Sequence, residues 1–313
     1  QNIQEVNHWN QSVMLQTNAS LDVGILGKAL DQILNHHDAL RLCYHRINNN
    51  WQQEYGTAAD ANLLEVVDFS DIEIFKQLEA IEQHANNIET SLNILKGQLV
   101  KVVYYKRSKN EHDHLFIVVH HLAIDGISWR ILLEDIQMLY RGFSREESVK
   151  LPAKTTSFQY WSESLNRYAQ EKALVSEFQY WKNMWDKNID PLPVDTHEYE
   201  NDEASTSLQH FYLNEESTSL LIKEVPAAYN TQINDILLTS LFLAYKRWAL
   251  KDHLLIQLEG HGREDLFEDI DISRTLGWFT TAFPVYLEKS GTNIKDTLVS
   301  VKEQLRKIPK NGI

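Results

Sequence analysis

A polar cluster follows a strongly apolar run of the sequence. Residues 116–119 form the apolar run FIVV, which is typical of a buried strand, and HHLAIDG follows it directly. Neighbouring strand residues point to opposite faces, so His120 and His121 are expected to face different ways. Asp125 and Gly126 predict a turn that leads into a helix. Histidine is the side chain best suited to moving protons near neutral pH, and this pattern predicts an imidazole held rigidly at the edge of a cavity.

Two other interpretations of these histidines stay open at this point. A histidine beside a buried strand is more often a hydrogen-bonded core residue than a catalyst. A zinc site is the weaker alternative, because His121 and Asp125 lie four residues apart without clearly sharing a helix and no third ligand is nearby. His112, Asp113 and His114 also suggest a metal, but they fall in a predicted exposed hairpin turn. We therefore predict no metal site.

A second polar group ends a predicted strand in the last third of the chain. Apolar and polar residues alternate over residues 254–259, and Glu259 is followed by GHGRE. Glycines on both sides of His261 favour close backbone approach and unusual dihedral angles. A carboxylate at the end of a buried strand is expected to have its pKa raised by desolvation, which suits a base for a weakly acidic proton. A salt bridge between Glu259 and Arg263 is an equally supported alternative.

Strand and helix patterns alternate on both sides of a break at residues 190–205. This segment has two prolines, several acids and little apolar periodicity, and we expect it to be a linker. Residues 1–189 and 206–313 are then two α/β subdomains. The expected strands are 6–16, 41–47, 51–55, 99–105, 115–120, 208–213, 254–259 and 280–287. The expected helices are 22–37, 71–92 (capped by Ser70 or Asp71), 127–140 (ended by Gly142), 158–168, 178–185, 233–250 and 294–308.

Composition narrows the class of protein. The 313 residues are 43% hydrophobic and 24% charged, as in an ordinary globular protein. The net charge of −14 argues against a nucleic-acid-binding surface. Cys43 is the only cysteine, so no internal disulfide forms, which fits a reducing compartment. We find no run of ~20 apolar residues and no signal peptide, so we expect a cytoplasmic protein without a membrane partner.

Three motifs together carry a family resemblance. HHLAIDG resembles the HHxxxDG motif of the condensation superfamily, which includes chloramphenicol acetyltransferase-like enzymes and the condensation and epimerization domains of nonribosomal peptide synthetases. SWRIL, which begins with Ser128 and Trp129, is similar to the continuation found in epimerization domains, whereas condensation domains usually lack the Trp-Arg pair. EGHGRE, from Glu259 onward, and TLGWFT, which contains Gly277 and Trp278, resemble two further epimerization motifs. The order of the motifs also matches that family.

The resemblance covers nearly the whole chain and implies a fold. HWNQS at residues 8–12 is similar to an early segment of epimerization domains. The family begins earlier, with a proline-containing motif, and continues past Ile313 with an Asn-Tyr motif whose tyrosine is thought to help at the active site. We therefore expect a chain truncated at both ends. The implied fold is α/β with mixed layers, formed by two chloramphenicol acetyltransferase-like subdomains in a V-shaped pseudo-dimer, the second incomplete.

The implied reaction is inversion of the α-carbon of an aminoacyl or peptidyl thioester. The substrate is carried on the 4′-phosphopantetheine of a carrier domain, and the catalyst needs no cofactor of its own. The family match assigns Glu259 as the base for the L-substrate and His121 as the group that reprotonates or stabilises the enolate, although these roles could be exchanged. The implied partners are the upstream peptidyl carrier domain and, indirectly, a downstream condensation domain.

The resemblance also implies supporting roles around the two proton-transfer residues. His120 is expected to anchor the turn, and Asp125 to be a structural residue bonded to Arg41 or Arg263. His261 is a weaker candidate for proton transfer. The alternatives are a peptide-bond-forming condensation domain, disfavoured by SWRIL and EGHGRE, and an inactive module that only docks carrier domains. A chloramphenicol-type transferase is the least favoured.

Overall fold

The computed structural model describes residues 5–48, 50–57, 63–185, 187, 189–195, 205–291 and 293–313. The chain divides into two compact units, and the division is not a single cut. The first unit comprises Gln1–Ala169 and Asp265–Thr280, and the second comprises Gln170–Glu264 and Thr281–Ile313. The predicted boundary at 189/190 therefore falls inside the second unit, and one later segment returns to the first. Residues 196–204 of the predicted linker lie outside the described residues.

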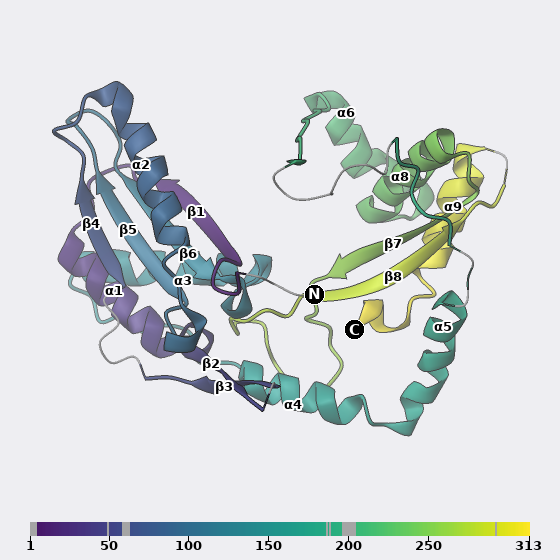
Figure 1. Ribbon diagram of the computed structural model, residues 1–313, viewed down its shortest axis with the longest axis horizontal. Coiled ribbons are helices and arrows are strands. Elements are labelled where there is room, and N and C mark those ends of the chain that lie inside the picture. The colour runs from purple at the N-terminus through teal and green to yellow at the C-terminus, as the bar shows by residue number, and fades with distance from the viewer. Residues whose placement is uncertain are drawn as a thin grey trace. The chain divides into compact units, whose positions relative to one another are not determined.

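A four-stranded sheet forms the centre of the first unit. Its strand order is β1-β6-β5-β4, and the pairs are antiparallel except for the parallel pair β4–β5 (Figure 1). Strand β6 is buried from its second residue to its end, because helices cover both faces of the sheet. This explains the unbroken apolar run in the sequence. The strands are β1 (Asn10–Gln16), β4 (Leu64–Asp68), β5 (Val100–Lys106) and β6 (His114–His120).

Helices on the two faces of the sheet enclose two hydrophobic cores. Helices α1 (Val23–His36) and α3 (Gly126–Ser144) pack on one face, and α2 (Ile74–Glu89) packs on the other. Asp22 and Asp125 cap α1 and α3, since each carboxylate accepts a hydrogen bond from a backbone N–H of the first turn. These elements hold the end of β6 and the start of α3 in fixed positions.

The first unit also contains a separate hairpin and several short helices. The antiparallel strands of the hairpin are separated by a turn that contains Asn48, whose φ is 49°. The remaining elements are β2 (Leu42–Ile47), β3 (Asn50–Tyr55), η1 (Asp38–Arg41), η2 (Ile94–Lys96), η3 (His121–Ala123) and α4 (Phe158–Tyr168).

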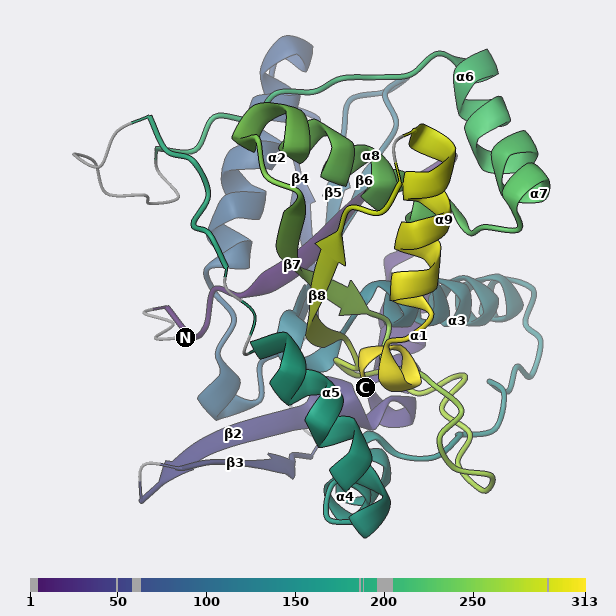
Figure 2. The same cartoon turned by 90° about the vertical axis from the view of Figure 1, so that its right-hand side faces the viewer.

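The second unit is built on an antiparallel pair, β7 (His253–Gly260) and β8 (Thr281–Glu288). Helices α8 (Ile233–Ala249) and α9 (Ile294–Leu305) pack on this pair and on each other, as can be followed in Figure 2. Phe242, Leu254 and Val301 are among the buried residues of this core. The other elements are η4 (Lys172–Leu174), α5 (Val175–Trp185), α6 (Glu215–Ser219), η6 (Leu220–Glu224), α7 (Val225–Tyr229) and η7 (Pro309–Gly312).

The predicted cap of α2 and the predicted glycine end of α3 are wrong. Helix α2 begins at Ile74, and its N-cap residue is Glu73, whose side chain makes no capping bond. Ser70 lies in the turn before the helix, where its backbone N–H is bonded to the Asp68 carboxylate. Helix α3 continues through Gly142 and ends at Ser144. A Cβ at Gly142 would lie 1.8 Å from a methyl carbon of Val149, so this glycine provides packing space within the helix rather than a helix end.

The predicted strand at 208–213 is also wrong. The segment contains leucines and aromatic residues of the kind found in strands, but no strand pairs with it among the residues that the structure describes. Its large apolar side chains are exposed, Phe211 and Tyr212 to 88% each. A strand needs a hydrogen-bonded neighbour as well as suitable residue types, and composition alone does not supply one.

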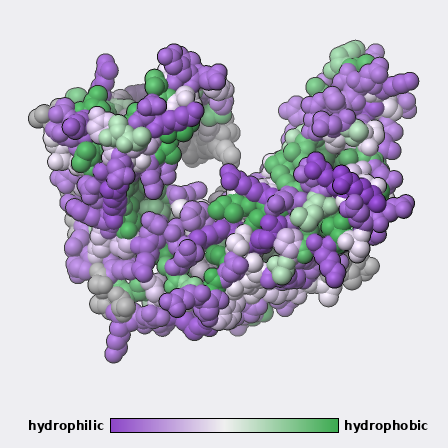
Figure 3. Space-filling view, turned by 180° about the vertical axis from the view of Figure 1, so that it is seen from behind, coloured by the Kyte–Doolittle hydropathy of each residue, from purple (hydrophilic) through white to green (hydrophobic). Residues whose placement is uncertain are grey.

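On the face drawn in Figure 3, hydrophilic residues predominate and the hydrophobic ones form separate patches. None of the described helices is both long enough and apolar enough to span a bilayer.

Candidate active site

The turn after β6 is held by His120. This residue is 1% exposed, and its Nε2 lies 2.9 Å from the carbonyl oxygen of Val6, to which it donates. Its Nδ1 accepts from the backbone N–H of Leu122 at 3.2 Å. Burial lowers the pKa of the His120 imidazole, because it disfavours the charged form. A neutral ring with both nitrogens occupied joins the segment before β1 to the turn after β6.

His121 points the other way and is half-buried. Its Nδ1 lies 2.9 Å from the carbonyl oxygen of Ile124, and its Nε2 lies 3.1 Å from the amide nitrogen of Gln11 on β1. The other end of that amide, Gln11 Oε1, accepts from the indole nitrogen of Trp129 at 2.8 Å. The His121 ring also lies against Trp278, with ring centroids 4.4 Å apart and planes tilted by 33°. The histidine therefore has a fixed orientation.

Helix α3 connects this turn to residues 277–279, about 150 positions later in the sequence. The Asp125 carboxylate accepts from the backbone N–H of Ser128 at 2.7 Å and from that of Phe279 at 3.2 Å. The Ser128 hydroxyl donates to the Gly277 carbonyl at 3.1 Å and accepts from the Gly277 N–H at 3.2 Å. These bonds join two of the sequence motifs. They also place Trp278 beside His121.

Gly277 is required by the closeness of that packing. A Cβ at this position would lie 2.5 Å from the ring of Phe158, which packs edge-on against Phe279. At Gly126, in contrast, nothing lies within 4 Å of an added Cβ, and the residue is exposed at the start of α3. Asp125 alone therefore supplies the predicted turn into the helix, and Gly126 leaves open space next to it.

An apolar pocket of about 270 Å³ lies next to the histidine turn. Trp9 and Trp278, whose rings both lie near His121, form part of its wall, together with Trp51. His120 is the one lining residue with an ionisable ring nitrogen. The pocket can therefore accept an apolar group close to His121.

Glu259 belongs to the second unit, and the burial expected for it is wrong. It is the seventh residue of β7, paired with Ala282, and its side chain is exposed. Leu254, Ile256 and Leu258 point to the core under α8 and α9, so Glu259 points to the opposite, uncovered face. It forms no salt bridge to Arg263 among the described residues, and that alternative is also wrong.

His261 is engaged in local contacts. Its Nδ1 accepts from the backbone N–H of Arg263 at 2.9 Å, and its Nε2 lies 3.3 Å from a carboxylate oxygen of Glu264. The expectation for the two glycines is confirmed: Gly262 has a φ of 67°, and a Cβ at Gly260 would lie 2.9 Å from the Thr281 hydroxyl.

The expected partner of Asp125 is partly corrected. The Arg41 guanidinium donates to the carbonyl oxygens of Leu34 and Asn35 and pairs with Asp38, so it does not bind Asp125. A pairing with Arg263 stays a prediction.

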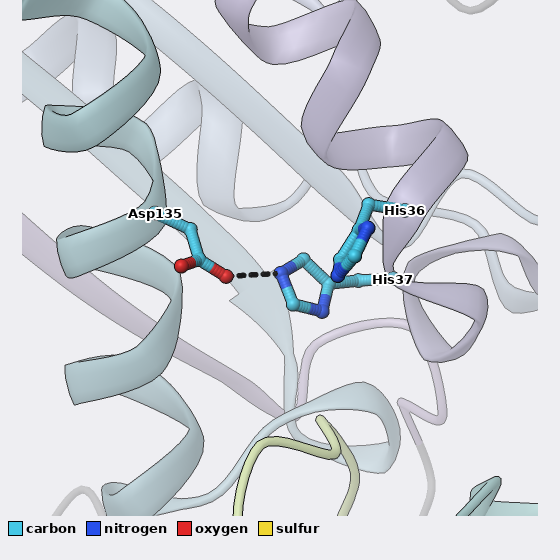
Figure 4. A group of neighbouring side chains, drawn as sticks. All are labelled: His36, His37 and Asp135. Atoms are coloured by element: carbon cyan, nitrogen blue, oxygen red, sulfur yellow. Dashed lines mark hydrogen bonds and ion pairs between the residues drawn. The ribbon is translucent and has the colours of Figure 1, made fainter. Parts of the chain in front are cut away.

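Sequence reasoning missed a cluster of titratable side chains in the first unit, two of which are buried. His36, His37 and Asp135 have potential ligand atoms within 4.8 Å of one another (Figure 4). One Asp135 oxygen accepts from His37 Nε2 at 2.9 Å, and the other is bonded to the Arg274 guanidinium. Both Asp135 oxygens are therefore occupied, and the positive guanidinium of Arg274 would repel a metal cation at this position. We interpret the cluster as a structural link between α1, α3 and the returning segment.

The second suggested metal group is also structural. Asp113 is buried rather than exposed, and its carboxylate accepts from the Tyr104 hydroxyl at 2.5 Å and the Ser20 hydroxyl at 2.9 Å. His112 is bonded to the Thr17 carbonyl at 3.0 Å. These residues fasten the turn before β6.

Fold and sequence together place the chain in the condensation-domain family. The family model described as Condensation domain matches residues 1–313, and the chain belongs to that family. A linear gramicidin synthase from Brevibacillus parabrevis is 43% identical over 309 residues, and tyrocidine synthase 1 from the same organism is 38% identical over 318. These matches cover 98% and 100% of the chain but 6% and 29% of the relatives, so the chain spans a small part of each.

Solved structures share the mixed α/β, chloramphenicol acetyltransferase-like fold. The epimerization domain from the third module of tyrocidine synthetase B matches with a TM-score of 0.94 and 35% identity, covering 100% of this chain and 71% of that one. The first condensation domain of the calcium-dependent antibiotic synthetase matches with a TM-score of 0.75 at 16% identity, covering 96% and 68%, which shows the fold alone.

Proposed function

We propose that this chain is an epimerization domain that inverts the α-carbon of an aminoacyl or peptidyl thioester held on the phosphopantetheine arm of a carrier domain. One observation carries the proposal: SWRIL, EGHGRE and TLGWFT occur together in a chain that is 35% identical to a solved epimerization domain over its whole length. The bonds from Asp125 and Ser128 to residues 277–279 support it further, since they join two of these motifs next to one histidine.

The chemistry consists of two proton transfers. A base removes the proton from the α-carbon, and the electron pair of the broken C–H bond passes into the thioester carbonyl to give an enolate. A proton then returns to the α-carbon from the opposite face, and the carbonyl reforms. Nothing is oxidised or reduced, so the domain needs no redox cofactor of its own. Each positioned acid or base typically contributes about 10²–10⁴-fold to the rate.

His121 and Glu259 are the proposed proton-transfer residues. The bond from His121 Nδ1 to the Ile124 carbonyl leaves the Nε2 lone pair as the basic site. Glu259 is exposed and forms no salt bridge among the described residues, so its carboxylate is accessible to a substrate. The proposal requires both groups to reach one α-carbon from opposite faces. The substrate comes from an upstream carrier domain, and the product passes to a downstream condensation domain. The relatives named as synthases of linear gramicidin and tyrocidine support this setting.

The test is an exchange assay in deuterated buffer. A carrier domain loaded with an L-aminoacyl or peptidyl phosphopantetheine thioester is mixed with the protein, without any acceptor. Deuterium at the α-carbon and D-product are expected. Glu259→Gln should slow inversion by about 10²–10⁴-fold, and His121→Ala should impair it severely. One-sided exchange survives in one variant if each residue serves one face.

Matched controls separate these effects from general disturbance. Glu288→Gln removes an exposed carboxylate at the end of β8, and His45→Gln removes an exposed imidazole from β2. Both should retain normal inversion. Peptide-bond formation with an added acceptor and no α-deuterium would instead assign the chain to condensation. Neither reaction, with carrier binding retained, would favour a docking module.

A further inference from the structure

The hydrogen bonds around Gln11 have only one consistent set of donors and acceptors. An indole N–H can only donate, so the Gln11 atom 2.8 Å from Trp129 Nε1 must be the amide oxygen. The amide NH₂ therefore faces His121 Nε2, 3.1 Å away. Since that group donates, Nε2 must accept, and it carries no hydrogen.

The opposite side of the ring shows that the other ring nitrogen, Nδ1, carries a hydrogen. A carbonyl oxygen can only accept, so the ring nitrogen 2.9 Å from the Ile124 oxygen carries a hydrogen. His121 is therefore neutral, with its proton on Nδ1 and its lone pair on Nε2. The contact with Gln11 leaves Nε2 without a hydrogen and the contact with Ile124 places the hydrogen on Nδ1, so the assignment needs both observations.

We propose that Gln11, oriented by Trp129, is a positioning residue that keeps His121 neutral with Nε2 as the proton acceptor. Ile124 alone fixes the proton on Nδ1 but does not oppose a second proton on Nε2. Gln11 opposes it, because an Nε2–H would meet the amide NH₂ donor to donor. Turning the amide over would relieve that conflict but would set its NH₂ against the Trp129 N–H. The indole thus prevents the amide from accommodating a charged His121.

Packing holds Gln11, Trp129 and His121 in this arrangement. Gln11 is the second residue of β1 and pairs with Val119 of β6, and Trp129 is 9% exposed in the core below α3. The ring of Trp278 covers His121 on one side. Gln11 holds the lone pair at rest and must release it when a substrate proton arrives. This role deepens the proposed function, since it rests on His121 acting in proton transfer.

The first readout needs no substrate. With nitrogen-15-labelled histidine, the His121 spectrum should show a protonated Nδ1 and an unprotonated Nε2 at neutral pH. Gln11→Glu keeps the length of the side chain and an oxygen for Trp129, but offers Nε2 an acceptor, so Nε2 should become protonated. Trp129→Phe frees the amide to turn and should move the Nε2 signal in the same direction. Gln16→Glu, an exposed change on the same strand, is the matched control and should leave the His121 spectrum unchanged.

The second readout is the α-carbon exchange rate. Gln11→Glu should lower it by about 10- to 100-fold, since hydrogen bonds to charged groups are worth about 1.5–3 kcal/mol, whereas Gln16→Glu should not. A wild-type spectrum with Nε2 protonated, or an unchanged Nε2 signal in both Gln11→Glu and Trp129→Phe, overturns the positioning role. The expected spectra without any exchange in wild-type protein would uphold that role and refute the epimerase instead.

Discussion

Replacing Ser128 with alanine tests the link between the histidine turn and residues 277–279. The Ser128 side chain is fully buried, and its hydroxyl both donates to and accepts from Gly277. Ser128→Ala removes two hydrogen bonds, each worth about 1 kcal/mol, and leaves a buried N–H and carbonyl without this partner at a further cost of ~1 kcal/mol or more. We expect the first unit to lose about 3 kcal/mol of unfolding free energy.

Urea unfolding followed by tryptophan fluorescence measures that loss, and hydrogen exchange of residues 265–280 locates it. Exchange should accelerate in this segment before the rest of the first unit. Ser144→Ala is the matched control on the same helix, because the Ser144 hydroxyl is bonded to the Tyr140 carbonyl one turn earlier on the exposed side. It should cost less than about 0.5 kcal/mol. Equal losses for the two variants, or unchanged exchange at 265–280 in Ser128→Ala, would refute the reasoning.

Three further predictions concern single positions in the first unit. Gly277→Ala should destabilise the protein by about 1–3 kcal/mol, because its Cβ would lie 2.5 Å from the Phe158 ring; an unchanged melting temperature would contradict this. Gly126→Ala should change the unfolding free energy by less than about 1 kcal/mol, since nothing lies near an added Cβ. A much larger loss of unfolding free energy, measured by calorimetry, would contradict the open site. Because burial lowers the pKa of His120 from 6.5, the unfolded chain binds this proton first as the pH falls. The stability that His120 contributes is thus present above about pH 6.5 and lost on acidification, and the fall in melting temperature from pH 7.5 to 5.5 should be smaller in His120→Gln than in wild-type protein.

Local patterns in the sequence predicted most elements because these patterns follow from burial. The unbroken FIVV run required a strand covered on both faces, and β6 is such a strand. The stripe from Ile25 to Leu34 required a helix on a core, and Asp22 marked its start. The same reasoning failed where strand formation depends on a pairing strand. Residues 208–213 have no such strand among the described residues.

The sequence alone determined that His121 follows a buried strand, that Asp125 begins a helix, and which family the motifs resemble. Only the tertiary structure decided what surrounds His121. Gln11 lies 110 positions away and Gly277 lies 149 positions from Ser128, so no local periodicity contains these contacts. The tertiary structure also decided that Glu259 is exposed. Alternate residues of a strand point to two faces, and only the packing of α8 and α9 decides which face is covered.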